Sequence, residues 1–225
     1  MFERYVIPRQ SLAELEFAPD RRWWRFEPRF NVGAQQYVPA IRLHGEQSEG
    51  LMMRWGLICA WEECRPDALP PPVIADDEIL NSARHRDPWL NSQRCILPVA
   101  GFYAWRLTPE HYRQPYFVQL PDRSVFGVAG IWDCSQGEDE DVIESFSIII
   151  VPAHDRLREA ANCGPALPAI LRRKDYAAWL RGSPEEAMAA TCASVPMNLL
   201  GYAVSPRINS LAVDEPTLIQ PVARD

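Results

Sequence analysis

Lysine is nearly absent from this chain of 225 residues, in which Lys174 stands alone beside 22 arginines. The guanidinium of Arg stays protonated and cannot serve as an amine nucleophile at neutral pH. Chemistry that forms an imine would therefore depend on Lys174 or on the α-amine of the first residue. The arginines are suited instead to bidentate contacts with phosphate groups.

Cysteine pairs with the spacing of metal ligands are also missing. The six cysteines include no Cys-x-x-Cys pair, and only Cys59 and Cys64 lie close together. A zinc site or a disulfide framework is the weaker interpretation, and reduced thiols are the expected state. We expect neither a metal nor a cofactor.

Long apolar runs and an excess of positive charge are lacking as well. No run approaches the length of a membrane span, and the first ten residues include charges where a signal peptide would be apolar. The sequence therefore predicts a cytoplasmic protein with no membrane partner. The net charge of −7 argues against polyanion binding by the whole surface, although a local basic groove remains possible.

What is present is a pattern of short strands, with 21 Pro against 11 Gly. The apolar, β-branched and aromatic segments that predict strands are residues 4–8, 37–43, 52–59, 94–105, 115–120, 124–132 and 145–151. The Pro121-Asp122 turn predicts a hairpin between two of them, and residues 135–141 form an acidic loop at a tip between strands.

Fewer segments predict helices. They are residues 11–17, 154–161, 174–181 and a segment that starts after Ser183. Ser183 can cap this last helix, Pro184 fits its first position, and Glu186 can complete a capping box. No linker or repeat divides residues 1–225. We therefore expect one α+β domain of mostly antiparallel strands curled into a barrel-like core, with a few peripheral helices.

A set of short motifs runs in order along nearly the whole chain. They are Arg4-Tyr5, Phe30-Asn31-Val32, Arg54-Trp55-Gly56-Leu57-Ile58 with Trp61, Asn81-Ser82-Ala83-Arg84, residues 94–105, Gln114-Pro115-Tyr116, Ala129-Gly130-Ile131-Trp132, Val204-Ser205 and residues 218–222. This ordered set resembles the SOS-response-associated peptidase (SRAP) family, and the chain looks like a divergent, phage-related member. The resemblance implies the family's fold and a place in the DNA damage response.

The resemblance also implies a chemistry. Family members recognise abasic sites in single-stranded DNA, where the α-amine of an N-terminal Cys forms an imine with the sugar aldehyde. The Cys thiol then closes a thiazolidine ring and gives a stable protein–DNA crosslink. An Asn, a Glu and a His position the sugar and move protons.

Most of these groups are replaced here. Phe2 stands at the place of the Cys, and Ala104 at the place of the Glu. The Asn survives as Asn81 only if the match shifts by one residue, since otherwise Ser82 takes its place. Residues 160–165, where the His is expected, contain none. The resemblance therefore implies a catalytically degenerate member.

The remaining motif residues have two interpretations each. The resemblance implies that Arg4, Arg84 and Asn31 contact DNA, although surface ion pairs are a common fate of Arg. Trp61 and Trp105 can stack on bases or pack in the core. In the same way, Asn81 can hold a ligand or cap a turn.

Cys163 beside Gly164 invites a nucleophile hypothesis, but an inert thiol is the simpler interpretation because no base is placed beside it. By contrast, Cys95 lies in an apolar pattern and is expected in the core. His44, His85 and His111 have no evident partners, so we expect them in exposed loops.

Three functions follow from these observations. The first is a paralogue that binds single-stranded or abasic DNA without crosslinking to it, and the surviving Arg and Trp motifs favour it. The second is an enzyme with relocated chemistry at the Met1 amine or the Cys163 thiol. The third is a structural or protein-interaction module, which the acidic net charge favours. No feature of the sequence indicates a protein partner.

Overall fold

The computed structural model describes residues 2–7, 27–62, 69–109, 111–137, 141–161, 163–192 and 198–222. The predicted helix over residues 11–17 lies outside these ranges. The strands are β1 (Tyr5–Ile7), β2 (Arg29–Val32), β3 (Tyr37–His44), β4 (Gln47–Trp55), β5 (Val73–Ala75), β6 (Arg94–Val99), β7 (Gly101–Leu107), β8 (Arg113–Gln119), β9 (Phe126–Gln136), β10 (Val142–Pro152), β11 (Ala166–Pro168), β12 (Ile170–Leu171) and β13 (Leu200–Ala203). The α-helices are α1 (Ala83–Leu90), α2 (Asp155–Ala161), α3 (Tyr176–Arg181) and α4 (Pro184–Cys192).

A closed ring of strands forms the barrel. In order, β10, β4, β3, β6 and β9 are hydrogen-bonded neighbours, and β9 pairs again with β10 to close the ring. Only the β10–β4 contact in this ring is parallel. The predicted α+β fold with a barrel-like core of mostly antiparallel strands is confirmed, and closure leaves the ring without an open edge.

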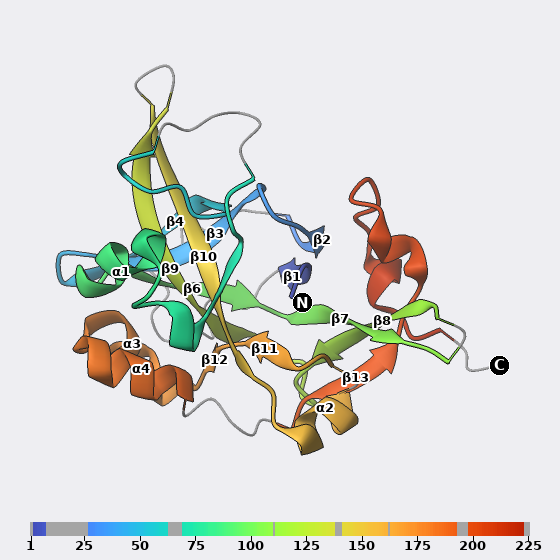
Figure 1. Cartoon of the computed structure of the whole chain (residues 1–225). Coiled ribbons are helices and arrows are strands. Elements are labelled where there is room, and N and C mark those ends of the chain that lie inside the picture. The colour runs from blue at the N-terminus through green and yellow to red at the C-terminus, as the bar shows by residue number, and fades with distance from the viewer. Residues whose placement is uncertain are drawn as a thin grey trace.

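A second sheet, in the order β13-β8-β7-β1-β2, lies beside the barrel (Figure 1). Residues 94–105, predicted as one strand, form two strands that join different sheets, β6 in the barrel and β7 beside it. The break falls at Ala100, whose N–H donates to the carbonyl of Val6 in β1. The chain therefore passes from one sheet to the other inside the most apolar motif of the sequence.

The predicted hairpin around Asp122 is wrong. The turn is present, and the Asp122 carboxylate accepts hydrogen bonds from the N–H and hydroxyl of Ser124. However, β8 before it pairs with β7 and β13, whereas β9 after it belongs to the barrel. Turn residues mark a change of direction but do not determine which strands pair.

Helices α1, α3 and α4 pack outside the barrel. Their buried residues Trp89, Trp179 and Ala187 share a core cluster with barrel residues such as Ile41 and Ile131. The predicted helices at 154–161 and 174–181 correspond to α2 and α3.

The predicted capping box of α4 is confirmed, because the N–H of Ser183 donates to the Glu186 carboxylate at 2.8 Å and the Glu186 N–H to the Ser183 hydroxyl at 3.3 Å. This reciprocal pair satisfies two of the donors that a helix leaves free at its start.

Strand β1 lies between β7 and β2 and brings the N-terminal segment into the space between sheet and barrel (Figure 1). The main core cluster contains residues from both, among them Tyr5, Trp55 and Phe102. The expected core positions of Trp55 and Cys95 are confirmed, since both are fully buried. The start of the chain therefore packs at the centre of the molecule.

Candidate functional site

Phe2 lies at the heart of this junction and is 4% exposed. Its ring centroid lies 5.8 Å from that of Trp55, 5.7 Å from that of Phe102 and 6.1 Å from that of Tyr5. Tilted and offset ring pairs at these distances are mutually stabilising. Phe2 is therefore a packed core residue at the position where the family resemblance implies a nucleophile.

Ala104 lines the same small pocket as Phe2. The pocket has a volume of about 20 Å³, and its wall also includes Phe102, Cys163 and Gly164. Ala104 belongs to β7 and is 6% exposed. Positions 2 and 104 are thus neighbours in space, and neither supplies a thiol or a carboxylate.

A larger groove continues outward from this pocket. It measures about 450 Å³ and shares Trp105, Cys163 and Gly164 with the inner pocket. Arg106 and Arg158 lie on its walls. So do the acidic residues Asp155 and Glu159, and the Asp155 carboxylate pairs with Arg158 at 3.2 Å. The groove therefore presents charges of both signs.

Trp105 is held in the groove wall by two contacts. Its indole N–H donates to the Asn209 side-chain oxygen at 3.0 Å, and the Arg113 guanidinium carbon lies 5.9 Å from the ring centroid.

The groove wall also includes Cys163, and burial raises the pKa of its thiol. A raised pKa lowers the thiolate fraction, which is the reactive form.

Trp61 lies on a loop that follows β4. The loop backbone is anchored by Ser145, whose hydroxyl accepts from the Ile58 N–H at 2.8 Å, and by Asp133, whose carboxylate accepts from the Ala60 N–H at 2.9 Å. The Trp61 side chain is 67% exposed. This loop therefore displays a large aromatic ring on a fixed backbone.

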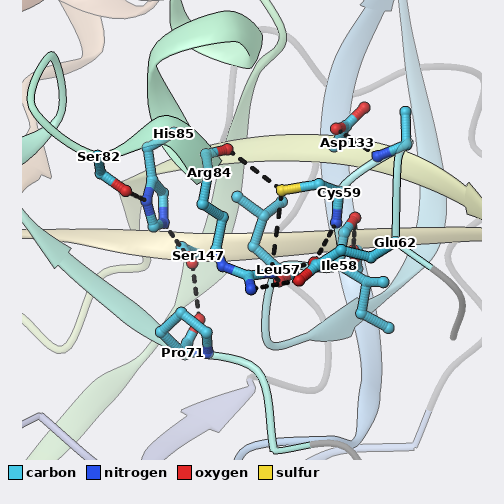
Figure 2. A network of polar contacts seen from close by, with 12 residues as sticks. Leu57, Ile58, Cys59, Glu62, Pro71, Ser82, Arg84, His85, Asp133 and Ser147 are labelled. Carbon is cyan, nitrogen blue, oxygen red and sulfur yellow. Dashed lines mark hydrogen bonds and ion pairs between the residues drawn. The ribbon is translucent and has the colours of Figure 1, made fainter. Parts of the chain in front are cut away.

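Arg84 reaches this loop from α1, as Figure 2 shows. Its Nη1 donates to the Leu57 carbonyl at 2.8 Å, and both terminal nitrogens bind the two carboxylate oxygens of Glu62. The guanidinium carbon also lies 6.0 Å from the centroid of the Trp61 ring. Arg84 is thus part of an internal bidentate ion pair, and its side chain is 23% exposed.

Cys59 completes this network. Its N–H donates to Glu62 at 2.9 Å, and its thiol donates to the Arg84 carbonyl at 3.4 Å. Burial raises the pKa of the Cys59 thiol to about 12, so the sulfur keeps its proton at neutral pH. The loop and the start of α1 are therefore tied together by both side-chain and backbone contacts.

The expectation that His85 lies in an exposed loop is wrong, because His85 is 2% exposed on α1. Ser147 donates its hydroxyl hydrogen to the Pro71 carbonyl, so its oxygen must accept from the Nε2–H of His85 at 3.1 Å. The Nδ1 of His85 then accepts from the Ser82 hydroxyl at 2.8 Å (Figure 2). Burial, aided by the charge of Arg84, lowers the pKa of His85 to about 4.

Arg4 and Asn31 contact other parts of the chain. The Nη1 of Arg4 donates to the Glu3 carbonyl at 3.1 Å, and a Cβ added at Gly33 would lie 2.8 Å from that nitrogen. Asn31 is fully buried, and its amide donates to carbonyls of Ser210 and Val213 at 2.9 and 2.8 Å. The Asn31 amide nitrogen therefore donates its hydrogen bonds to the C-terminal segment. The side chain of Arg4 is half-buried.

Asn81 is exposed in the turn before α1, and the residue at the N-cap position is Ser82. The structure thus gathers the predicted residues into two places: Phe2, Ala104 and Trp105 at the pocket, and Trp61 and Arg84 at the loop. The two places are connected along one segment, because Phe2 packs on Trp55 while Leu57 binds Arg84.

Sequence reasoning missed Glu62, because nothing in the sequence predicts its pairing with an Arg on a later helix. Among the described residues there is no group of three or more His, Cys, Asp or Glu arranged to hold a metal ion. In the same ranges, no helix has the length and apolar character needed to cross a bilayer.

Comparisons with known proteins place these observations in context. The family model described as SOS response associated peptidase (SRAP) matches residues 2–211. The chain is 26% identical to the mouse (Mus musculus) abasic site processing protein HMCES, over 96% of this chain and 74% of that protein. It is 24% identical to the abasic site processing protein YoaM of Bacillus subtilis, over 82% and 81% of the two chains.

Among solved structures, a crystal structure of a protein from Bacteroides thetaiotaomicron superposes with a TM-score of 0.81 and 21% identity. The match covers 99% of this chain and 100% of that one. This likeness shows that the two chains share a fold.

Proposed function

The chain belongs to the SOS response associated peptidase (SRAP) family, and on that premise we propose that it binds single-stranded DNA without forming a covalent bond to it. Two of its relatives are named as abasic site processing proteins. DNA that contains an abasic site is therefore the first ligand to test. A protein that binds such DNA noncovalently would keep the family's contacts with the strand but would not form the crosslink.

The observation that carries this proposal is the shared pocket of Phe2 and Ala104. A thiazolidine needs a thiol beside the reacting amine, and a buried phenyl ring supplies none. Proton transfer by a positioned acid or base contributes roughly 10²–10⁴-fold to a rate, and Ala104 offers no carboxylate for it. The ring of Phe2 also fills space that an incoming sugar would need.

Noncovalent contacts are supported by the loop and the groove. An exposed Trp can stack on a base of any identity, which suits binding without sequence preference. Trp61 has this exposure, and Arg84 lies beside it. Trp105 offers a second aromatic surface in a groove that also includes Arg106 and Arg158. The net charge of −7 works against binding at long range, so we expect weak affinity.

A second candidate function is relocated chemistry at Cys163, which the position of this thiol beside Phe2 in the pocket favours. Its raised pKa works against a nucleophilic role at neutral pH. The third possibility, a protein-interaction module, predicts no contact with DNA at all. These alternatives give different products when the protein meets an abasic strand.

The test incubates the protein with a labelled abasic oligonucleotide, with and without borohydride, and resolves the products on a denaturing gel. We expect no covalent band under either condition, while a native gel shows a retarded complex. A band that forms without borohydride would show that a crosslink is made after all, and one seen only with borohydride would reveal an imine. The absence of a retarded complex would favour the interaction module. An oligonucleotide without the abasic site serves as the control.

A further inference from the structure

The carboxylate of Glu62 occupies a cradle of hydrogen-bond donors at the loop (Figure 2). Arg84 binds it with two terminal nitrogens, Nη2 at 2.5 Å from Oε1, and the Cys59 N–H donates to Oε2 at 2.9 Å. A guanidinium fork together with a backbone N–H also suits the geometry of a phosphate group. Glu62 therefore occupies a site that fits an anion of either kind.

The donors of this cradle are held in place by contacts that do not involve Glu62. Arg84 stays oriented by its hydrogen bond to the Leu57 carbonyl, and its own carbonyl accepts from the Cys59 thiol. The next N–H along the loop, that of Ala60, is bound to Asp133. We therefore expect the cradle to keep its shape when the Glu62 carboxylate leaves it.

The cradle is partly exposed to solvent. The side chains of Glu62 and Arg84 are each 23% exposed, and the neighbouring Trp61 ring is 67% exposed. A strand that stacks a base on Trp61 would place its phosphates beside the cradle. The carboxylate and a phosphate cannot both occupy it, because two anions in one site repel each other.

We propose that Glu62 is a built-in competitor for DNA, occupying the phosphate site of Arg84 until a phosphodiester of a bound single strand displaces it. This inference rests on the proposed binding of single-stranded DNA. Arg84 can then contact the strand only after the ion pair between Glu62 and Arg84 has been broken. Glu62 then sets a weak affinity and favours strands that also offer a base to Trp61.

The ionisation of Glu62 is consistent with this role. Partial burial alone would raise the pKa of its carboxyl, but the hydrogen bonds from Arg84 and from the Cys59 N–H outweigh burial and leave the pKa below its ordinary value. The carboxylate is therefore charged at neutral pH, and displacement rather than protonation must release it.

The test compares Glu62→Gln with the wild type by fluorescence anisotropy of a labelled single-stranded oligonucleotide across a salt series. Glu46→Gln is the matched control, because Glu46 is exposed in the β3–β4 turn and its replacement changes the net charge equally. We expect Glu62→Gln to bind at least about threefold more tightly than Glu46→Gln. The log–log salt slope should be the same for the two variants, because Arg84 contacts one phosphate of the strand in both complexes.

Equal affinities of Glu62→Gln and Glu46→Gln, with a wild type that binds DNA, would overturn the competitor role and leave the proposed function intact. No binding by any of the three proteins would overturn both. Adding Arg84→Ala to Glu62→Gln should remove the gain, and a gain that persists would also contradict the proposal.

A measurement on the unaltered chain covers the case in which Glu62→Gln does not fold. The Glu62 carboxyl is titrated by carbon-13 NMR with and without a saturating oligonucleotide. Its pKa should rise on binding, because the displaced carboxylate loses the donors that lower its pKa. An unchanged pKa in the complex would show that Glu62 stays in the cradle and would overturn the inference.

Discussion

The rings of Phe2 and Trp55 pack with their centroids 5.8 Å apart, and this contact joins the segment before β1 to the barrel. Trp55 is fully buried at the end of β4, immediately before the segment that displays Trp61. The residue that replaces the implied nucleophile is thus also part of the core that supports the loop of Trp61.

Truncation of Phe2 should destabilise the protein. Removal of a buried Phe side chain typically costs about 3–5 kcal/mol, because contacts are lost and a cavity remains. We expect Phe2→Ala to lower the free energy of unfolding by about 3 kcal/mol, measured by urea denaturation. Trp61→Ala is the control, since an exposed ring should contribute less than about 0.5 kcal/mol. Equal effects of the two changes would contradict the packed position of Phe2.

Restoring the nucleophile alone should not restore efficient crosslinking. The double change Phe2→Cys with Glu3→Gly supplies the thiol, but Ala104 still offers no acid or base, and residues 160–165 contain no His. Adding Ala104→Glu should raise the yield of crosslink to an abasic oligonucleotide, measured over time on a denaturing gel. If the double variant already crosslinks as fast as an active family member, other residues in the pocket must move the protons.

Arginine and tryptophan should contribute to DNA binding in distinguishable ways. Arg4→Ala combined with Arg84→Ala removes the two proposed phosphate contacts, so the salt slope should flatten by up to about 0.7 per contact. Stacking is scarcely affected by salt, so Trp61→Ala should weaken binding by about 1–3 kcal/mol without changing the slope. Trp61→Phe, which keeps an aromatic face, should recover part of the affinity. Anisotropy titrations measure all of these, and a changed slope in Trp61→Ala would argue against stacking.

The buried position of His85 predicts a loss of stability in acid. The unfolded chain protonates this His near its ordinary pKa of about 6.5, whereas the folded chain resists protonation until about pH 4. Below pH 6.5 the unfolded state therefore binds more protons, and the free energy of unfolding falls until about pH 4. The shift corresponds to roughly 3 kcal/mol.

Urea denaturation of the wild type and of His85→Gln between pH 4 and 7.5 measures this contribution. The free energy of unfolding of His85→Gln should lack most of the pH dependence that His85 supplies in the wild type. His44→Gln, a change at an exposed His, is the control variant. A curve for His85→Gln that parallels the wild type would contradict the burial of His85.

The sequence predicted the barrel because short strands rich in apolar, β-branched and aromatic residues dominate the chain and the order of its motifs resembles a family pattern. The hairpin that it predicted at the Asp122 turn was wrong, since strand pairing depends on contacts between distant segments. It placed His85 wrongly because α1 has a Pro88 in its interior and a buried face of His85, Pro88 and Trp89, which differs from the usual apolar stripe of a helix.

Within the candidate site, motif order identified Phe2 and Ala104, which the fold brings into one pocket. The Glu62–Arg84 pair could not be predicted in the same way. A Glu in the acidic pair Glu62-Glu63 has the character of a solvated surface residue. Only the packing of α1 against the loop brings Arg84 to Glu62. Side-chain pairs that join separate elements have no local signature in the sequence.

The central claim is that this chain binds single-stranded DNA without reacting with it, and a titration of wild-type protein into a labelled abasic oligonucleotide at low salt tests it most directly. We predict a saturable rise in fluorescence anisotropy that weakens as salt increases, with a log–log slope shallower than about −2. After the same sample is denatured, the label should migrate as free oligonucleotide. No rise in anisotropy at low salt, or a label that stays attached to denatured protein, would contradict the account.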